Sequence, residues 1–166
     1  MFKLEYRFIE YKPDFSTKEK REVEHNEAYL LLYDMLKKHF DIEYPIVLRT
    51  SNGKPYIEND GVFFNLSHTD GLVCCVVADT PCGVDCEKII DKSNLMGLAK
   101  RYFVGNEIEV MKSSNYSNET FFKIWTCKEA VGKRIGCGFI LAHKIDSTKE
   151  NCNTIIENGY IISVNV

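Results

Sequence analysis

An uninterrupted apolar run from Leu72 to Ala78 constrains the fold of this chain more than any other feature. Such a run is typical of a β-strand that is buried on both faces. A turn at residues 79–81 follows it, and Cys82 to Lys88 is expected to form the next strand. Because the connection is short, we expect these two strands to pair as an antiparallel hairpin.

The residues before this run predict a strand, a helix and two short strands. Lys3 to Ile9 alternates polar and apolar residues, as a half-buried strand does. Ser16 followed by Glu19 fits a capping box that opens a long helix ending near Phe40. The short strands are expected at 46–50 and 63–66.

The second part of the chain predicts two helices and a final hairpin. The helices are expected at 95–102, capped by Ser93, and at 119–134, with a polar loop at 112–118. Asn158-Gly159 predicts a type I′ turn between the last strands. This order of elements favours the α+β class with mainly antiparallel sheet.

The composition is that of an ordinary globular domain. The chain has 166 residues, of which 45% are hydrophobic and 27% charged, with a net charge of −3. This length fits a single domain, residues 1–166. The net acidity argues against a nucleic-acid binder that relies on a basic face, and no window approaches the roughly 18 apolar residues of a membrane span. We therefore expect neither a nucleic acid nor a membrane as partner.

The cysteines favour a reducing compartment. They number seven, and no pair has C-x-x-C spacing. Cys74 and Cys75 lie in the apolar run, where cysteine behaves as a small core residue. A disulfide framework is therefore not expected, and the N-terminus lacks the apolar core of a signal peptide. Together these features favour a cytoplasmic location.

Two carboxylates in the segment 83–88 (GVDCEK) form the first candidate site. Alternation along a strand places Asp85 and Glu87 on one face, with Val84 and Cys86 pointing inward. Neighbouring carboxylates repel each other unless a cation lies between them, and their hard oxygens suit Mg²⁺. A solvated strand face explains the same pattern, so both interpretations stay open at this point.

The segment 125–133 (WTCKEAVGK) forms the second candidate site, in the second long helix. A core stripe at helical spacing comprises Phe121, Ile124, Val131 and Ile135. Beside it runs a stripe from Trp125 to Glu129 and Lys133, which lie at the boundary of the core. Taken alone, this pattern favours an ordinary i,i+4 Glu–Lys pair.

Two further segments carry groups suited to phosphate. Ser67 and His68 lie where a strand meets a turn, and hydroxyl, imidazole and free backbone N–H groups there can hold a phosphate. A catalytic Ser–His pair is not expected, because adjacent residues on an extended chain point to opposite faces. Arg49 and Lys54 flank a glycine turn, where two cations would clamp phosphate. Both segments are equally ordinary as surface turns.

In this order and spacing, the segments resemble the 4′-phosphopantetheinyl transferases, specifically the longer monomeric class to which the surfactin-synthetase-activating enzymes belong. The matches are RTSNGKP (49–55), NLSH (65–68), GVDCEK (83–88), AKRYF (99–103) followed by Glu107, and WTCKEAVGK (125–133). The resemblance extends over about residues 45–140. It implies transfer of the 4′-phosphopantetheine group from coenzyme A to a serine of an apo acyl or peptidyl carrier protein, with release of 3′,5′-ADP.

The resemblance also implies a metal site and a base. Mg²⁺, or Mn²⁺, would be held by Asp85, Glu87 and Glu129. Lys133 would join the cation in neutralising the pyrophosphate. Glu129 is expected to accept the serine proton, directly or through a water, with Asp85 as its rival.

Coenzyme A would be bound by phosphate contacts in the same family pattern. The matching residues are Ser67, His68 and Lys54, joined by Arg49 and by Lys133 at the pyrophosphate. The family fold implies two similar α+β halves related by a pseudo-twofold axis, here about 1–90 and 91–166, with coenzyme A in the cleft between them. The class implies a monomer, and carrier recognition is expected near the polar stretch 105–118.

Three rival functions remain. A non-catalytic homologue that binds coenzyme A or a carrier protein would keep the fold without turnover. A magnesium-dependent phosphoesterase or nuclease also uses clustered carboxylates and a lysine, but a nuclease should have a basic surface. A zinc site of Cys82, Cys86 and His68 is disfavoured, because hard carboxylates outnumber well-spaced thiolates.

Overall fold

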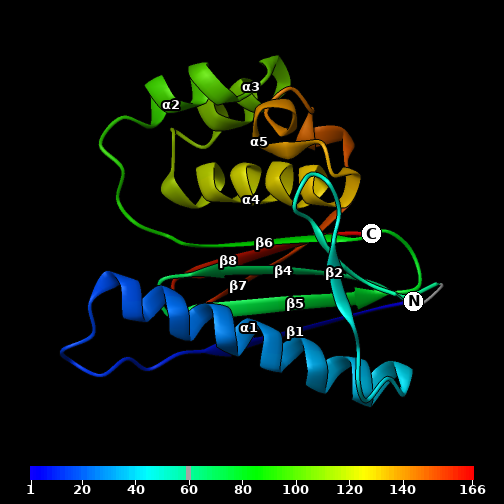
Figure 1. Cartoon of the computed structure of the whole chain (residues 1–166). Coiled ribbons are helices and arrows are strands. Elements are labelled where there is room, and N and C mark those ends of the chain that lie inside the picture. Colours follow the sequence, from blue (N-terminus) through cyan, green and yellow to red (C-terminus); the bar gives the residue numbers. More distant parts are fainter. Residues whose placement is uncertain (59–60) are drawn as a thin grey trace.

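The computed structural model describes residues 1–58 and 61–166, without the side chains of residues 139 and 140. Strands form the middle of the molecule, with α1 on one side and α2 to α5 on the other (Figure 1). The strands are β1 Phe2–Phe8, β2 Val47–Arg49, β3 Pro55–Ile57, β4 Phe63–Thr69, β5 Leu72–Ala78, β6 Gly83–Lys88, β7 Cys152–Glu157 and β8 Tyr160–Asn165. The helices are α1 Thr17–Phe40, α2 Leu95–Tyr102, α3 Gly105–Ser113, α4 Asn118–Ile135 and α5 Gly138–Ala142, with a 3₁₀ turn η1 at Ser147–Lys149.

The strands form two three-stranded sheets, ordered β1-β5-β4 and β6-β8-β7, and a small β2-β3 hairpin. All of these pairings are antiparallel, so the predicted α+β class with antiparallel sheet is confirmed. The predicted hairpin of β5 with β6 is wrong. The turn between them carries the chain from one sheet to the other, and β6 pairs with β8 instead.

The two sheets share one topology. In each sheet, the central strand is the last of the three in the sequence, and it pairs with the other two. β5 is central in the first sheet and β8 in the second. A long helix covers one face of each sheet, α1 in the first unit and α4 in the second. β6 belongs to the second sheet, since it pairs with β8. The division of the chain into halves near residue 90 stays a prediction. A pseudo-twofold axis between the units stays a prediction.

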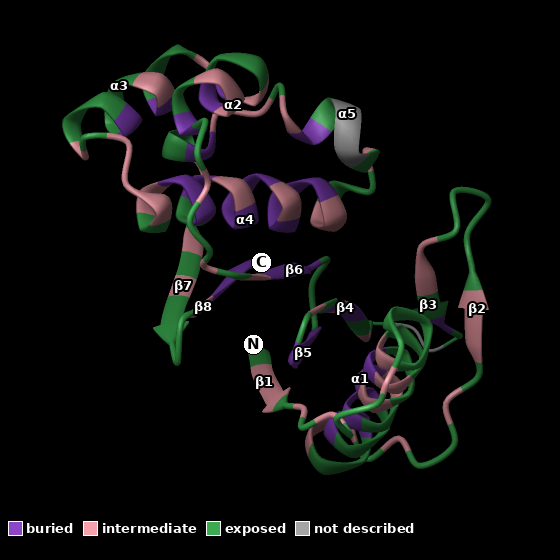
Figure 2. Cartoon of the chain, turned by 90° about the vertical axis from the view of Figure 1, so that its left-hand side faces the viewer, coloured by how far each residue is buried: buried purple, intermediate pink, exposed green. Residues whose placement is uncertain are grey.

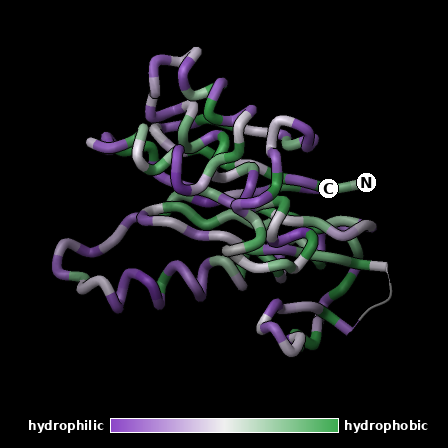
Figure 3. The backbone as a smooth tube through the Cα atoms, turned by 90° about the horizontal axis from the view of Figure 1, so that it is seen from above, coloured by the Kyte–Doolittle hydropathy of each residue, from purple (hydrophilic) through white to green (hydrophobic). Residues whose placement is uncertain are grey.

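The central strand β5 is buried on both faces, as its apolar run predicts. Val73, Cys75 and Val77 pack with the buried face of α1, whereas Leu72, Cys74 and Val76 pack with residues of β6 and β8. A third cluster lies between β8 and the helices α2 to α4 (Figure 2). Hydrophobic segments are accordingly concentrated in the middle of the molecule, where the strands lie (Figure 3).

Three local predictions, a helix cap, a turn and the inward face of a strand, are confirmed. Ser16 caps α1 with Glu19 in a capping box. Asn158 and Gly159 both have positive φ, of 50° and 78°, as a type I′ turn requires. Val84 and Cys86 point into the core, as expected from alternation along β6.

Other local expectations are corrected. Asn94, not Ser93, caps α2. The expected polar stretch 105–118 contains α3, which is held in place by the buried side chain of Glu107. Ile135 is 57% exposed at the end of α4, beyond the core stripe to which it was assigned.

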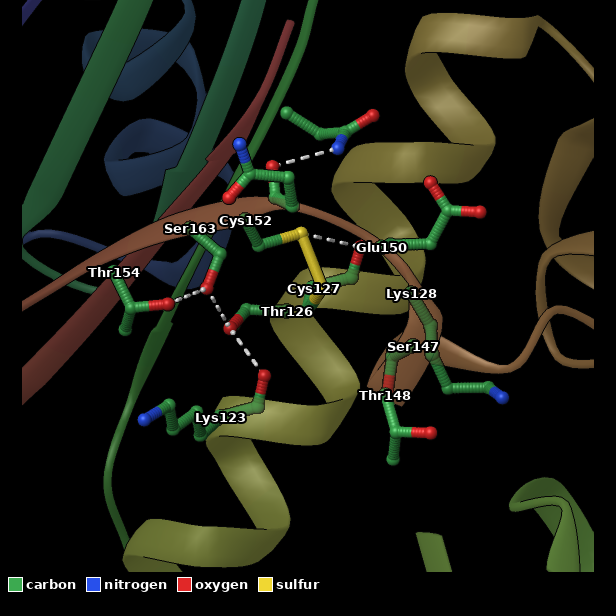
Figure 4. The surroundings of a disulfide bond; sticks show 12 residues. Lys123, Thr126, Cys127, Lys128, Ser147, Thr148, Glu150, Cys152, Thr154 and Ser163 are labelled. Atoms are coloured by element: carbon green, nitrogen blue, oxygen red, sulfur yellow. Dashed lines mark hydrogen bonds between the residues drawn. A yellow bond between two sulfur atoms is a disulfide. The ribbon is translucent and has the colours of Figure 1, made fainter. Parts of the chain in front are cut away.

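Cys127 of α4 and Cys152 of β7 form a disulfide, so the expectation that the cysteines are all reduced is wrong for this pair (Figure 4). The pairing depends on the packing of α4 against β7, which residue spacing alone does not reveal. Thr126 and Thr154 both hydrogen-bond to the hydroxyl of Ser163 nearby, so the disulfide and this hydroxyl chain tie α4 to the β7-β8 hairpin. The other described cysteines are free. No helix in the described part of the chain is long and apolar enough to cross a bilayer.

Candidate functional site

A cleft where β4, β6 and α4 meet gathers most of the predicted site residues. The two sheets touch along β4 and β6, where Val84 N donates to Asn65 Oδ1 at 3.0 Å. Two adjoining pockets open there, with volumes of about 610 and 340 Å³. They share Leu66, Glu129 and Lys133, so they form one continuous cleft.

Lys133 is the central cation of this cleft. Its Nζ donates to Asp85 Oδ1 at 2.7 Å, to Ser67 Oγ at 2.9 Å and to Val84 O at 3.0 Å. Ser67 Oγ donates in turn to Asp85 Oδ1 at 2.9 Å. Burial lowers the pKa of Lys133, but the adjacent Asp85 carboxylate outweighs it and the pKa is raised overall. Lys133 therefore carries its charge at neutral pH, paired with Asp85 rather than with Glu129, its neighbour one helical turn away.

The three predicted metal-binding carboxylates line the smaller pocket. Asp85 and Glu87 project from one face of β6, and Glu129 faces them from α4. Burial, followed by the charge of Asp85, raises the pKa of Glu87 and of Glu129 to about 7. Within the described residues, no three His, Cys, Asp or Glu side chains are close enough together to hold a metal ion as they stand. The structure brings the three carboxylates to one pocket, and their metal role stays a prediction.

Lys54 reaches the cleft from the turn between β2 and β3, a hairpin that rises to the end of α4 in Figure 1. Its Nζ donates to Lys133 O at 2.6 Å and to Arg134 O at 3.3 Å. These carbonyls belong to the last turn of α4, whose acceptors lack partners within the helix. Lys54 therefore caps α4 while it lines the larger pocket with Gly53. Burial lowers the pKa of Lys54.

His68 borders the smaller pocket from β4 and is supported by a buried network. Its Nδ1 lies 2.9 Å from Glu24 Oε2, and Glu24 is 5% exposed. Tyr11 donates its hydroxyl to Glu24 and accepts a hydrogen bond of 2.7 Å from Gly71 N. No motif indicated Glu24, although its position four residues before Ala28 on the buried face of α1 was a signal for it.

Arg49 lies apart from the other predicted residues. It donates to Gly53 O at 3.0 Å and to Tyr29 Oη at 3.2 Å. It borders a separate pocket of about 600 Å³ beside α1. The structure therefore does not bring Arg49 into the cleft.

A buried ion pair, also missed, anchors α4 from behind the cleft. Lys128 and Glu107 are both 0% exposed, and Lys128 Nζ lies 2.7 Å from Glu107 Oε2. Lys128 also donates to the carbonyl of Ile145, and Glu107 accepts from Ser147 N at 2.7 Å. The pair fixes α3 and the segment 145–147 to α4.

His143 is a further cleft-side residue that no motif indicated. Its Nε2 lies 3.5 Å from Glu129 Oε1, and both side chains are largely buried. The imidazole packs against Trp125 and Tyr102, with ring centroids 4.8 and 4.9 Å away. Burial, followed by the charge of Lys128, lowers the pKa of His143.

Comparison with known proteins agrees with the motifs that line this cleft. Residues 81–159 match the model of the 4′-phosphopantetheinyl transferase superfamily. This chain is related to the 4′-phosphopantetheinyl transferases. The matched region contains Asp85, Glu87, Glu129 and Lys133, whereas the β2-β3 and β4 residues of the cleft lie outside it.

Curated relatives match at moderate identity. The 4′-phosphopantetheinyl transferase HetI of Nostoc sp. is 38% identical over 103 residues, covering 58% of this chain and 44% of HetI. The 4′-phosphopantetheinyl transferase gsp of Aneurinibacillus migulanus is 35% identical over 91 residues, covering 54% of this chain and 37% of gsp. A 4′-phosphopantetheinyl transferase of Bacillus subtilis is 34% identical over 92 residues, covering 54% and 40%. The chain thus spans less than half the length of these relatives. The family and these relatives are named as transferases.

Proposed function

We propose that this chain transfers the 4′-phosphopantetheine group of coenzyme A to a serine hydroxyl of an apo acyl or peptidyl carrier protein and releases 3′,5′-ADP. The observation that carries the proposal is the meeting of Asp85, Glu87, Glu129 and Lys133 at one pocket. All four lie in the region that matches the transferase family. The family resemblance further supports a cytoplasmic monomer built from two pseudo-twofold-related units.

The acidic side of the pocket fits a divalent cation. Its three side chains offer hard oxygen donors, which suit Mg²⁺ or Mn²⁺. Burial, followed by the charge of Asp85, raises the pKa of Glu87 and of Glu129, and a cation held between these carboxylates would relieve the repulsion among them. We therefore propose Asp85, Glu87 and Glu129 as metal ligands. A cation held there would neutralise charge on the coenzyme A pyrophosphate during transfer.

Basic and polar residues of the cleft are proposed to bind the phosphates. Lys133 is charged and anchored to Asp85, so it presents a fixed cation to the pyrophosphate. Ser67 and His68 face the smaller pocket from β4, and Lys54 borders the larger one. Arg49 lies outside the cleft and is not part of the proposed site.

Glu129 is the proposed base. The serine oxygen forms a bond to the β-phosphorus as the bond from that phosphorus to the ADP oxygen breaks, and the serine proton passes to the base. The raised pKa of Glu129, about 7, suits a group that accepts a proton at neutral pH. Asp85 is the weaker choice, because Lys133 and Ser67 already donate to its carboxylate.

Mass spectrometry of apo carrier proteins incubated with this protein, coenzyme A and Mg²⁺ tests the proposal. We expect a gain of one phosphopantetheine group on the carrier, abolished by a chelator. Glu129→Gln should abolish the gain, whereas Glu109→Gln, at a side chain 70% exposed on α3, should not change it.

Two further assays, of coenzyme A binding and of phosphoester hydrolysis, separate the rival functions. Coenzyme A binding without a mass gain on any carrier would favour a non-catalytic homologue. Hydrolysis of a phosphoester without coenzyme A binding would favour a phosphoesterase or nuclease. Near-normal transfer by Glu129→Gln would refute both roles assigned to Glu129.

A further inference from the structure

We propose that His143 is a positioning residue for Glu129, with its Nε2–H holding one carboxylate oxygen so that the other is presented to the divalent cation. The inference rests on the proposed function and extends it to a residue outside the motifs that indicated the family. No feature of the sequence marks His143, which lies between α5 and η1.

The geometry of the two side chains supports this role. His143 Nε2 lies 3.5 Å from Glu129 Oε1, and the two side chains are 9% and 15% exposed. Glu129 Oε1 has no hydrogen bond among the described residues, and His143 Nε2 is the ring atom paired with it. Hydrogen bonds of catalytic groups are often long before ligands bind and then shorten.

Aromatic packing fixes the orientation of the imidazole. It lies against Trp125 of α4 and Tyr102 of α2, with ring centroids 4.8 and 4.9 Å apart. Trp125 precedes Glu129 by one helical turn, so both lie on one stripe of α4. One stripe of α4 therefore carries both the Trp125 ring, which packs against His143, and the Glu129 carboxylate, which His143 contacts.

The backbone around His143 is held on both sides. Ala142 packs on Gly132 of α4 so closely that a Cβ at Gly132 would lie 2.5 Å from the Ala142 Cβ. On the other side, Lys128 bonds to the carbonyl of Ile145, and Ser147 N donates to Glu107 at 2.7 Å. His143 thus lies between two fixed points on the helix that carries Glu129, which is what a positioning residue requires.

A hydrogen bond from His143 would fix the orientation of the Glu129 carboxylate. Groups that hydrogen-bond to metal-binding side chains orient them, and their loss typically weakens metal binding or activity roughly 10–100-fold. Asp85 and Glu87 line the same pocket as Glu129, and Lys133 donates to Asp85. His143 places a ring nitrogen beside Glu129 Oε1.

Two replacements separate the N–H from the packing. His143→Phe keeps a ring against Trp125 and Tyr102 but removes the N–H, whereas His143→Gln keeps an amide N–H at a similar reach and loses the ring. The readout is Mn²⁺ affinity measured by electron paramagnetic resonance, together with kcat and KM for transfer. We expect Mn²⁺ binding about tenfold weaker for the Phe variant and within about threefold of the unmodified protein for the Gln variant.

His25→Phe is the matched control. His25 stacks on Tyr29 at 4.9 Å on the exposed side of α1, outside the cleft, so its replacement should leave Mn²⁺ affinity unchanged. Normal Mn²⁺ affinity in His143→Phe would overturn the proposal. Equal losses in the Phe and Gln variants would also overturn it, because they would indicate a role of the ring shape rather than the N–H.

A double-mutant cycle tests whether His143 acts through Glu129. If His143 acts through Glu129, His143→Phe should weaken Mn²⁺ binding less than twofold in a Glu129→Gln background. Additive losses would contradict the proposal. If the unmodified protein binds Mn²⁺ in a His143-dependent manner but transfers nothing, the proposed function fails and this inference stands. If it binds no Mn²⁺, the metal site and this inference both fail.

Discussion

The buried Lys128–Glu107 pair yields the sharpest prediction of stability. Replacing Lys128 with Met keeps the length of the side chain and removes the ammonium from a site that is 0% exposed. Glu107 then remains as a buried carboxylate without its cation, a change that typically costs about 3–5 kcal/mol. The carboxylate keeps hydrogen bonds from Val104 N at 2.8 Å and Ser147 N at 2.7 Å, which places the expected loss near the lower end, about 3 kcal/mol.

The assay is urea unfolding followed by circular dichroism, with thermal unfolding as a second measure. For a domain of this size, about 3 kcal/mol corresponds to a lowering of Tm by about 6–12 °C. The matched control is Lys112→Met. Lys112 Nζ also lies 2.7 Å from a carboxylate, that of Glu109, but the two side chains are 54% and 70% exposed. Its loss should leave the free energy of unfolding almost unchanged, because solvent screens exposed pairs.

One comparison would refute the reasoning. If the uncompensated charge is the cause, adding Glu107→Gln to Lys128→Met should recover part of the lost stability, because the amide still accepts a backbone hydrogen bond. A loss below about 1 kcal/mol in Lys128→Met alone would show that burial does not strengthen the pair as argued. A double variant less stable than Lys128→Met would show that lost packing, and not charge, dominates.

Three other predictions concern the cleft and the disulfide. Lys54→Ala should raise KM for coenzyme A about tenfold with a smaller change in kcat, because a charged phosphate contact is lost; an unchanged KM in steady-state kinetics would contradict it. Mg²⁺ should raise Tm more at pH 8 than at pH 6. The pKa of Glu87 and of Glu129 is raised to about 7, so both carboxylates are largely protonated at pH 6 and protons compete with the metal there. Equal shifts of Tm at both pH values would contradict this prediction. Reduction of the Cys127–Cys152 disulfide should lower the free energy of unfolding by about 2–4 kcal/mol, and Cys152→Ser should match the reduced protein in the same urea titration.

Local patterns in the sequence predicted most of the elements because those elements depend on local chemistry. The apolar run of β5, the capping box of Ser16 and the Asn158-Gly159 turn each determine structure within a few residues. The pairing of strands was predicted less well. The partner of β6 is β8, whose residues follow it by more than 70 positions, so a short turn after β5 was a poor guide to pairing.

The candidate site was predictable to the extent that it depends on periodicity. Alternation placed Asp85 and Glu87 on one face, and helical spacing placed Glu129 and Lys133 on one stripe. The pairing of Lys133 with Asp85 was not predictable, because Asp85 lies on β6, far from α4 in the sequence. His143 was missed for the same reason, since only the packing of the segment after α5 on α4 brings it to Glu129.

The pairing of β6 with the last strand has a consequence for synthesis on the ribosome. Tyr160 follows Lys88 by 72 residues. At a synthesis rate of roughly 5–20 residues per second, β6 therefore lacks its partner strand for about 4–14 s. Open strand edges invite pairing between chains, and inward-facing charges are one of the devices that prevent it. Asp85 and Glu87 lie on this strand, so we expect the two carboxylates that line the cleft of the finished protein also to disfavour pairing of the nascent β6 with other chains.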